Sequence, residues 1–124
     1  MLFRSESIKL FGHGGYFLTV GGMESIRRQY LGEGPNAKQP GDPYVSPLMA
    51  PNLAGLPPAL VITAEFDPLR SEGEAYVERL RAANVPARAH RFAGVGHGFF
   101  SMTSLFDEAD EAMDDIAAVL KSNF

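Results

Sequence analysis

Two residues of this chain, Asp67 and His97, are of the types that together activate a hydroxyl nucleophile. Asp67 stands in the run Glu65-Phe66-Asp67-Pro68-Leu69-Arg70, and His97 stands between two glycines in Gly94-Val95-Gly96-His97-Gly98-Phe99-Phe100. A hydroxyl nucleophile needs a base whose pKa lies near the working pH, which an imidazole provides. The imidazole in turn needs a carboxylate that fixes its tautomer and stabilises its charged form. The pair therefore supplies the acid and base of such a site, provided that the fold brings them together.

The nucleophile that such a pair would serve is missing from the sequence. None of the eight serines has a glycine two residues before it, so there is no Gly-x-Ser-x-Gly elbow, and there is no cysteine to replace a serine. We interpret the chain as carrying an acid and a base without their nucleophile.

Both residues also have a purely structural interpretation. Asp67 before Pro68 is a common start signal for a helix, in which the aspartate is the N-cap. His97 could be a loop histidine bonded to a carbonyl group. Of the other two histidines, His90 lies within a short strand pattern and is expected to be structural or exposed, and His13 follows a glycine near the start of the chain.

The pattern after residue 58 predicts an α/β fold with two parallel strands. Residues 59–64 are a continuous apolar run, which is typical of a strand covered on both faces, and residues 87–92 form a second, partly alternating strand. Amphipathic helices are predicted over about 69–83 and about 105–121. A strand, helix, strand order implies a right-handed crossover between neighbouring parallel strands, about 5 Å apart. Asp67 and His97 would then leave the same edge of the sheet within hydrogen-bond reach.

The first 58 residues give weaker signals. Residues 1–15 show no clear period, and we expect them to be irregular. Residues 20–31 are predicted to form a helix with Thr19 as its cap. Residues 32–58 contain seven prolines and should run as an ordered loop or short turns, although an interdomain linker is the competing interpretation. Packing against the body is favoured by several apolar side chains, namely Tyr44, Val45, Leu48, Met49 and Leu53.

Two strands are too few for a stable sheet of this kind. The strand over 59–64 should have a neighbour on each side, and only its later neighbour is encoded here. We therefore expect an incomplete sheet unless another chain completes it, and a homodimer is one way to complete it.

Composition excludes several function classes. The 124 residues are 45% apolar and 21% charged, as in one globular domain or a piece of a larger one, and the net charge is −4. The acidic balance argues against a nucleic acid or an anionic membrane surface as the main partner. The sequence has no apolar run long enough to span a bilayer, and the lack of cysteine fits a reducing compartment. We expect a soluble, cytoplasmic protein without a metal site, because the acids of residues 107–111 lack the loop geometry of a calcium site.

Three stretches resemble the carboxyl-terminal half of the hormone-sensitive-lipase-like bacterial carboxylesterases: Ser46-Pro47-Leu48, the run from Leu56 to Gly73 that contains Glu65-Phe66-Asp67-Pro68-Leu69-Arg70, and Gly96-His97-Gly98-Phe99. The resemblance covers roughly residues 15–122. It implies the carboxyl-terminal part of an α/β-hydrolase fold and the hydrolysis of short acyl esters through a Ser-His-Asp triad, without a cofactor. It also implies that Asp67 is the triad acid and His97 the triad base. Residues 1–50 would be a cap-like and connecting segment, and residues 51–124 part of the hydrolase domain.

The chain departs from that family in what it lacks. The family has a His-Gly-Gly-Gly oxyanion loop and a Gly-Asp-Ser-Ala-Gly elbow upstream, and neither is present. His13-Gly14-Gly15 imitates the loop but stands on the wrong side of the expected nucleophile, so we interpret it as a coincidence. We predict that the chain alone has little or no turnover and that an ester is its substrate only when the missing part is supplied. The alternative is a non-catalytic α/β module that acts through homo- or hetero-oligomer pairing.

Overall fold

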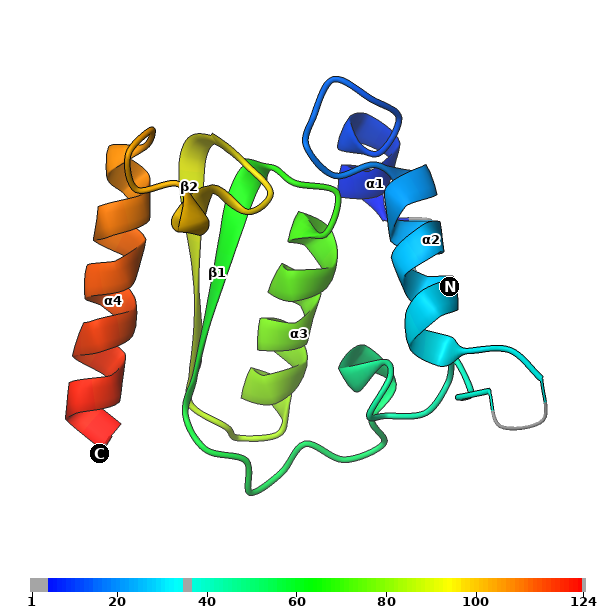
Figure 1. Ribbon diagram of the computed structural model, residues 1–124. Helices are drawn as coiled ribbons and strands as arrows, with labels where there is room; N and C mark the ends of the chain where they lie inside the picture. The colour runs from blue at the N-terminus through cyan, green and yellow to red at the C-terminus, as the bar shows by residue number, and fades with distance from the viewer. Residues whose placement is uncertain (1–4, 35–36, 124) are drawn as a thin grey trace.

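The computed structural model describes residues 5–34 and 37–123 and has an α/β architecture (Figure 1). Its centre is a parallel pair of strands, β1 (Ala59–Phe66) and β2 (Ala87–Gly96). Helix α3 (Arg70–Ala82) covers one face of the pair, and helix α4 (Asp107–Asn123) covers the other. The predicted α/β class and the crossover of strand, helix and parallel strand are therefore confirmed.

Both strands extend beyond the predicted ranges of 59–64 and 87–92. The register pairs Ala59 with Ala87 and continues in step to Ala64 and Phe92, and pairing resumes between Phe66 and Gly96. Between these points β2 advances four residues while β1 advances two, so β2 contains a bulge. The pattern of side chains cannot reveal this extension, because a bulge interrupts the alternation on which strand prediction depends.

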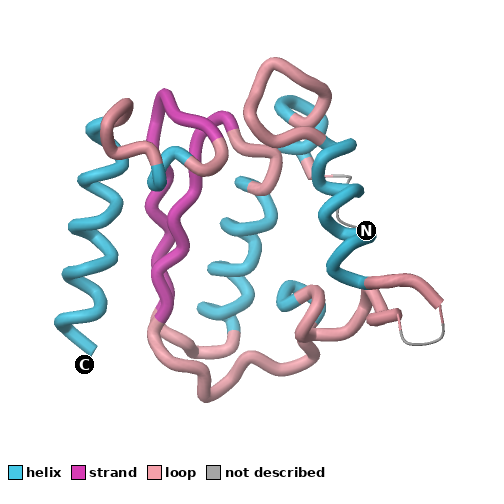
Figure 2. The backbone as a smooth tube through the Cα atoms, in the orientation of Figure 1, coloured by secondary structure: helices cyan, strands magenta, loops and turns pink. Residues whose placement is uncertain are grey.

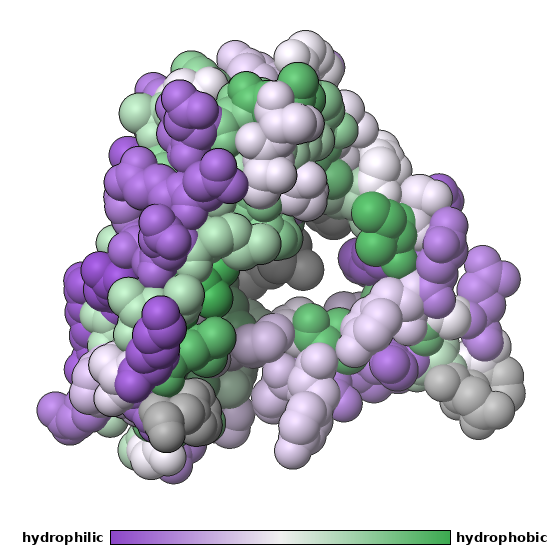
Figure 3. Space-filling model, turned by 60° about the vertical axis from the view of Figure 1, so that its left-hand side comes forward, coloured by the Kyte–Doolittle hydropathy of each residue, from purple (hydrophilic) through white to green (hydrophobic). Residues whose placement is uncertain are grey.

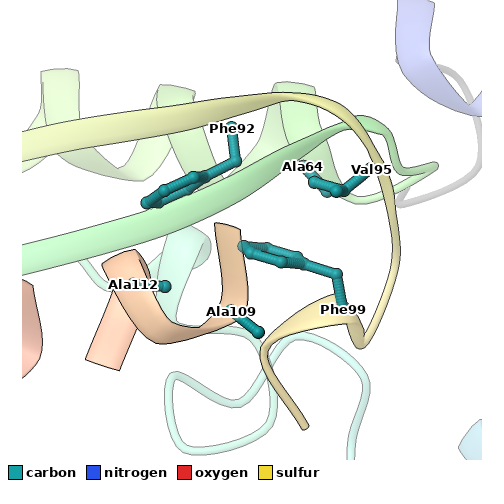
Figure 4. Close-up of a cluster of buried hydrophobic side chains, with 6 residues drawn as sticks. All are labelled: Ala64, Phe92, Val95, Phe99, Ala109 and Ala112. Carbon is teal, nitrogen blue, oxygen red and sulfur yellow. The ribbon is translucent and has the colours of Figure 1, made fainter. Parts of the chain in front are cut away.

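The main hydrophobic core lies between the sheet and α4 (Figure 4). Phe92 on β2 and Phe99 in the short helical turn η3 (Phe99–Ser101) have ring centroids 5.2 Å apart, and both are buried. The fully buried Ala109 and Ala112 bring α4 close to these rings. Helix α4 begins two residues later than predicted, and its apolar side chains Met113 and Leu120 are about half exposed.

Residues 5–15 are not irregular as predicted, because Glu6–Phe11 forms helix α1, and residues 1–4 of that prediction lie outside the described residues. Contacts with residues that are distant in the sequence stabilise this six-residue helix. The Ser7 hydroxyl donates to the Pro68 carbonyl at 2.6 Å and accepts from the Ser71 amide at 3.1 Å, while Ile8 is fully buried. A helix this short has no stability of its own, so a periodicity search misses it.

Helix α2 (Val20–Leu31) has the predicted range and the predicted cap, since the Thr19 hydroxyl accepts from the Gly22 amide at 3.1 Å. Helices α1 and α2 stand beside α3, on the side away from α4 (Figure 1). None of the residues of α2 is buried, so its apolar stripe does not serve the core.

The described residues of the proline-rich segment between α2 and β1, 32–34 and 37–58, form an ordered loop with one short helical turn, η2 (Pro47–Met49), as Figure 2 shows. It packs on the body, because Arg79 of α3 donates hydrogen bonds to the Leu48 and Ala50 carbonyls, and Leu53 is buried beside Leu80. The loop prediction is thus confirmed over a linker. Tyr44 and Met49 are exceptions among the predicted packing residues, since they are 92% and 54% exposed.

Candidate active site

Asp67 lies at the carboxyl end of β1, in the turn that leads into α3. Its Oδ1 atom accepts a hydrogen bond from the Leu69 amide at 2.8 Å, and only 12% of its side chain is exposed. The structure places Leu69, not Asp67, at the N-cap position of α3. Asp67 therefore caps the turn before the helix, which leaves its other oxygen, Oδ2, available for a second partner.

That second partner is His97, one residue beyond β2. The distance from His97 Nδ1 to Asp67 Oδ2 is 2.9 Å, a normal hydrogen bond. The expectation that the two side chains meet at one sheet edge is thus confirmed. Gly98, with φ +80°, turns the chain sharply after the histidine, whereas a Cβ atom at Gly96 would make an ordinary contact with the Phe17 ring at 3.4 Å. Gly98 is therefore needed for its left-handed backbone conformation.

The hydrogen bond also sets the electrostatics of the histidine. The Asp67 carboxylate accepts from Nδ1 and stabilises the imidazolium form, which raises the pKa of His97 above its ordinary value of 6.5 against the smaller opposing effect of burial. A proton on Nδ1 leaves Nε2 as the acceptor. Among the described residues, Nε2 has no hydrogen-bond partner. The site thus holds an oriented imidazole with a raised pKa and an available nitrogen.

An apolar cleft of about 390 Å³ opens in front of His97. Its walls come from α1, the segment before α2, α2 itself, the loop around residue 45 and the first turn before α3. The lining residues besides His97 are Ile8, Leu18, Met23, Ile26, Arg27, Tyr30, Leu31, Pro40, Val45, Ser46 and Leu69. The unburied apolar stripe of α2 therefore faces this cleft. An apolar cleft beside one oriented polar group is the usual form of a small-molecule site.

A groove of about 290 Å³ reaches the same histidine from the other side. It lies between β1 and α4 on the face that carries Leu60 and Ile62, and both Asp67 and His97 line it. Within residues 5–34 and 37–123, β1 pairs with β2 alone, so its other edge is open. The space-filling view shows the molecule hollowed between its two sides, with hydrophobic surface next to the opening (Figure 3). His97 is thus accessible from the cleft and from the open edge of the sheet.

The other histidines do not join this site. His13 is exposed and does not line the cleft or the groove. His90 lies on β2 and bonds through Nδ1 to Asp115 of α4, with its ring stacked on Phe92 at 4.1 Å between centroids. Its predicted structural role agrees with these contacts.

Some residues of the site were not foreseen from the sequence. Ser7 anchors α1 to the Asp67-Pro68 turn through the contacts described above, and Glu65 bonds across to β2 just before His97. A carboxylate near the end of an otherwise apolar strand was the available signal for Glu65. In the part of the chain that the structure describes, no cluster of three or more metal-ligating side chains occurs, and no helix is long and apolar enough to cross a membrane.

Comparison with known proteins identifies the family. A model of the alpha/beta hydrolase fold matches residues 2–101. The carboxylic ester hydrolase LipN of Mycobacterium tuberculosis is 35% identical over 120 residues, which are 97% of this chain and 31% of LipN. The hormone-sensitive lipase of Ictidomys tridecemlineatus is 33% identical over 75 residues, covering 59% of this chain and 10% of that protein. The crystal structure of EstE1, a thermostable carboxylesterase from a metagenomic library, superposes with a TM-score of 0.85 at 42% identity, over 96% of this chain and 40% of EstE1.

The chain therefore belongs to the α/β-hydrolase-fold family, among the hormone-sensitive-lipase-like carboxylesterases, as its motifs predicted. It spans about a third of the length of LipN and two fifths of that of EstE1.

Proposed function

We propose that Asp67 and His97 are the acid and base of a Ser-His-Asp triad that hydrolyses short acyl esters, with the serine and the oxyanion donors supplied by polypeptide outside these 124 residues. One observation carries the proposal. A histidine at one strand end is oriented at 2.9 Å by a largely buried carboxylate at the neighbouring strand end, beside an apolar cleft.

The chemistry follows from the free nitrogen of His97. Nε2 takes the proton of a serine hydroxyl as the serine oxygen attacks the ester carbonyl, and it returns that proton to the departing alcohol. Water then repeats the sequence on the acyl-enzyme, so that the acid leaves and the serine regains its proton. Asp67 stabilises the imidazolium in both steps without itself taking the proton.

The apolar cleft and the groove beside His97 suit the ester substrate and the serine, which must both reach the imidazole. We assign the acyl group to the apolar cleft, with residues 1–50 as a cap over it and residues 51–124 as the scaffold of the acid and base. The groove along β1 suits the approach of the nucleophile, since a strand paired to the open edge of β1 would end beside His97. A polypeptide with a Gly-x-Ser-x-Gly elbow at that strand end would complete the site.

A chimera of EstE1 tests this proposal. The segment of EstE1 that matches this chain is replaced by these 124 residues, and hydrolysis of p-nitrophenyl butyrate is measured after circular dichroism has shown that the chimera is folded. We expect turnover within about 100-fold of EstE1, since a displacement of about 1 Å costs that much. A folded chimera without activity would contradict the proposal.

The isolated chain supplies the complementary measurement. We expect it to hydrolyse p-nitrophenyl esters no faster than a matched amount of its His97→Ala variant, because its sequence has neither a Gly-x-Ser-x-Gly elbow nor a His-Gly-Gly-Gly loop. Turnover by the isolated chain that disappears in His97→Ala would show that a complete site exists within these residues.

A second candidate function is an oligomeric module without catalysis. The observation in its favour is the open edge of β1 with the half-buried Leu60, Ile62 and Ile116 along the groove. Pairing between two copies at this edge would cover these side chains. Light scattering after size exclusion should then give twice the monomer mass, and Ile62→Lys should restore the monomer while an exposed control, Gln29→Lys, should not. A monomer at every concentration would exclude this candidate.

A further inference from the structure

The bulge in β2 lies between the strand body and His97. At this point β2 has two more residues than β1, from the Ala64–Phe92 pair to the Phe66–Gly96 pair. Gly94 at the bulge has φ +75°, in the left-handed region, although a side chain there would meet no neighbouring atom. The glycine is therefore needed for its backbone conformation and not for space. A bulge leaves the extra residues unpaired and interrupts the ladder that otherwise fixes the two strand ends relative to one another.

Glu65 is the side chain that spans this bulge. It stands between the two paired residues of β1, and its Oε2 atom accepts a hydrogen bond from the Gly94 amide at 2.8 Å. The Gly94 amide thus finds a carboxylate where the regular ladder is interrupted. A charged acceptor makes a shorter and stronger bond than a neutral one.

The main chain of Glu65 is held as well. Arg70, the first residue of α3, donates from Nη1 to the Glu65 carbonyl at 2.8 Å. Glu65 is two residues before Asp67, and Gly94 is three residues before His97. The two residues joined by the Glu65–Gly94 hydrogen bond are therefore close along the chain to Asp67 and to His97, respectively.

We propose that Glu65 is a positioning residue whose carboxylate, by accepting from the Gly94 amide across the bulge, sets the two strand ends so that His97 Nδ1 meets Asp67 Oδ2. The geometry of the imidazole is then fixed from both strands. Its importance for catalysis rests on the triad role proposed above, but the positioning itself does not.

Two substitutions of Glu65 can separate the effect of its charge on His97 from the effect of its hydrogen bond. The nearby Arg91 is already paired with Glu74 through two bonds of 2.7 Å, and that pairing is the main cause of its raised pKa, with Glu65 a smaller contributor. Glu65→Gln keeps an acceptor of the same reach and loses the charge. Glu65→Asp keeps the charge and shortens the side chain by one carbon, so it cannot make the same bond.

The test measures the titration of His97 by NMR in the isolated chain, with its signal assigned by loss in His97→Gln. We expect Glu65→Gln to keep the raised pKa of His97, and Glu65→Asp and Glu65→Ala to return it toward 6.5 as the Asp67 contact loosens. Glu78→Ala, which removes an exposed carboxylate from α3, is the matched control and should change nothing. If Glu65→Ala fails to fold, the comparison of Glu65→Gln with Glu65→Asp still tests the proposal.

Two results would overturn the proposal. One is a His97 titration that is unchanged in folded Glu65→Asp and Glu65→Ala, and the other is a Gln variant that behaves like the Ala variant. In the EstE1 chimera we expect Glu65→Asp to lower kcat roughly 10-fold to 100-fold with little change in KM, because misplaced catalytic groups cost rate more than binding. An inactive chimera would count against the triad alone, because the NMR result does not depend on turnover.

Discussion

The molecule contains two histidine–carboxylate pairs with the same atoms in contact, and they differ in everything around them. His97 and Asp67 join the ends of two strands, whereas His90 and Asp115 join the middle of β2 to α4. Asp67 is oriented by a backbone amide and is nearly buried, while Asp115 is shared with Arg88 and is more exposed. The ring of His90 is stacked on Phe92, whereas the free nitrogen of His97 borders a cleft. A histidine–carboxylate contact alone therefore identifies no base, because the free nitrogen must also have somewhere to act.

The largest difference between the pairs should appear on removal of the histidines. In the EstE1 chimera, His97→Gln should lower kcat by at least about 10³-fold, because the serine then has no base. His90→Gln should change kcat less than about threefold, since His90 lies on the far side of the sheet core from the cleft. Equal losses in both variants would mean that both act through folding, which melting curves of the two proteins would reveal.

Replacement of the two carboxylates, Asp67 and Asp115, should give the next largest difference in kcat. Asp67→Asn keeps the shape of the side chain but no longer holds the imidazolium, and we expect kcat to fall by roughly 10³-fold to 10⁴-fold at neutral pH. Asp115→Asn is the matched control at the other pair and should leave kcat within about threefold. If Asp67→Asn retained full activity, Asp67 would be only the cap of its turn.

The elements behind this comparison were predictable to different degrees. The apolar run after Pro58 and the amphipathic pattern after Pro68 indicated β1 and α3, and parallel order alone placed Asp67 near His97. Local signals were sufficient there because each element is long and periodic. The catalytic roles of Asp67 and His97 stay a prediction, since geometry shows the contact and not the reaction.

What the sequence could not show depends on contacts between distant segments. Helix α1 exists because Ser7 is bonded to Pro68 in the turn after Asp67, 61 residues away, and no local pattern encodes that. The bulge clamped by Glu65 needs the partner strand to be known. Helix α2 was predicted with its correct range, but its apolar side chains line the cleft and not the core. Periodicity predicts which face is apolar and cannot tell whether protein or ligand covers it.

The contribution of the His97–Asp67 pair to the stability of the fold should decrease as the pH rises. The raised pKa of His97 means that the folded chain binds its proton more tightly than the unfolded chain. The stabilisation is therefore fully present below about pH 6.5 and is lost as the pH rises through the raised pKa. We expect His97→Gln to lower the denaturation midpoint at pH 5.5 and to have a smaller effect at pH 9. The expected loss is modest, because His97 is 42% exposed and solvent screens the pair.

The contribution of the His90–Asp115 pair to stability should have the opposite pH dependence and should be the smallest of those predicted. The hydrogen bond from His90 holds the pKa of Asp115 below its usual value of 3.8, with the charge of Arg88 contributing less. A lowered carboxyl pKa stabilises the fold above about pH 3.8, and this stabilisation is lost as the pH falls through the lowered pKa. Asp115→Asn should therefore lower the melting temperature slightly at pH 7 and less at a pH below the lowered pKa. Because Asp115 joins β2 to α4, the loss should appear as faster amide exchange in α4, with the His97 titration unchanged. A shift of the His97 titration in Asp115→Asn would show that the two pairs are coupled through the core between the sheet and α4, and the contrast between them would then fail.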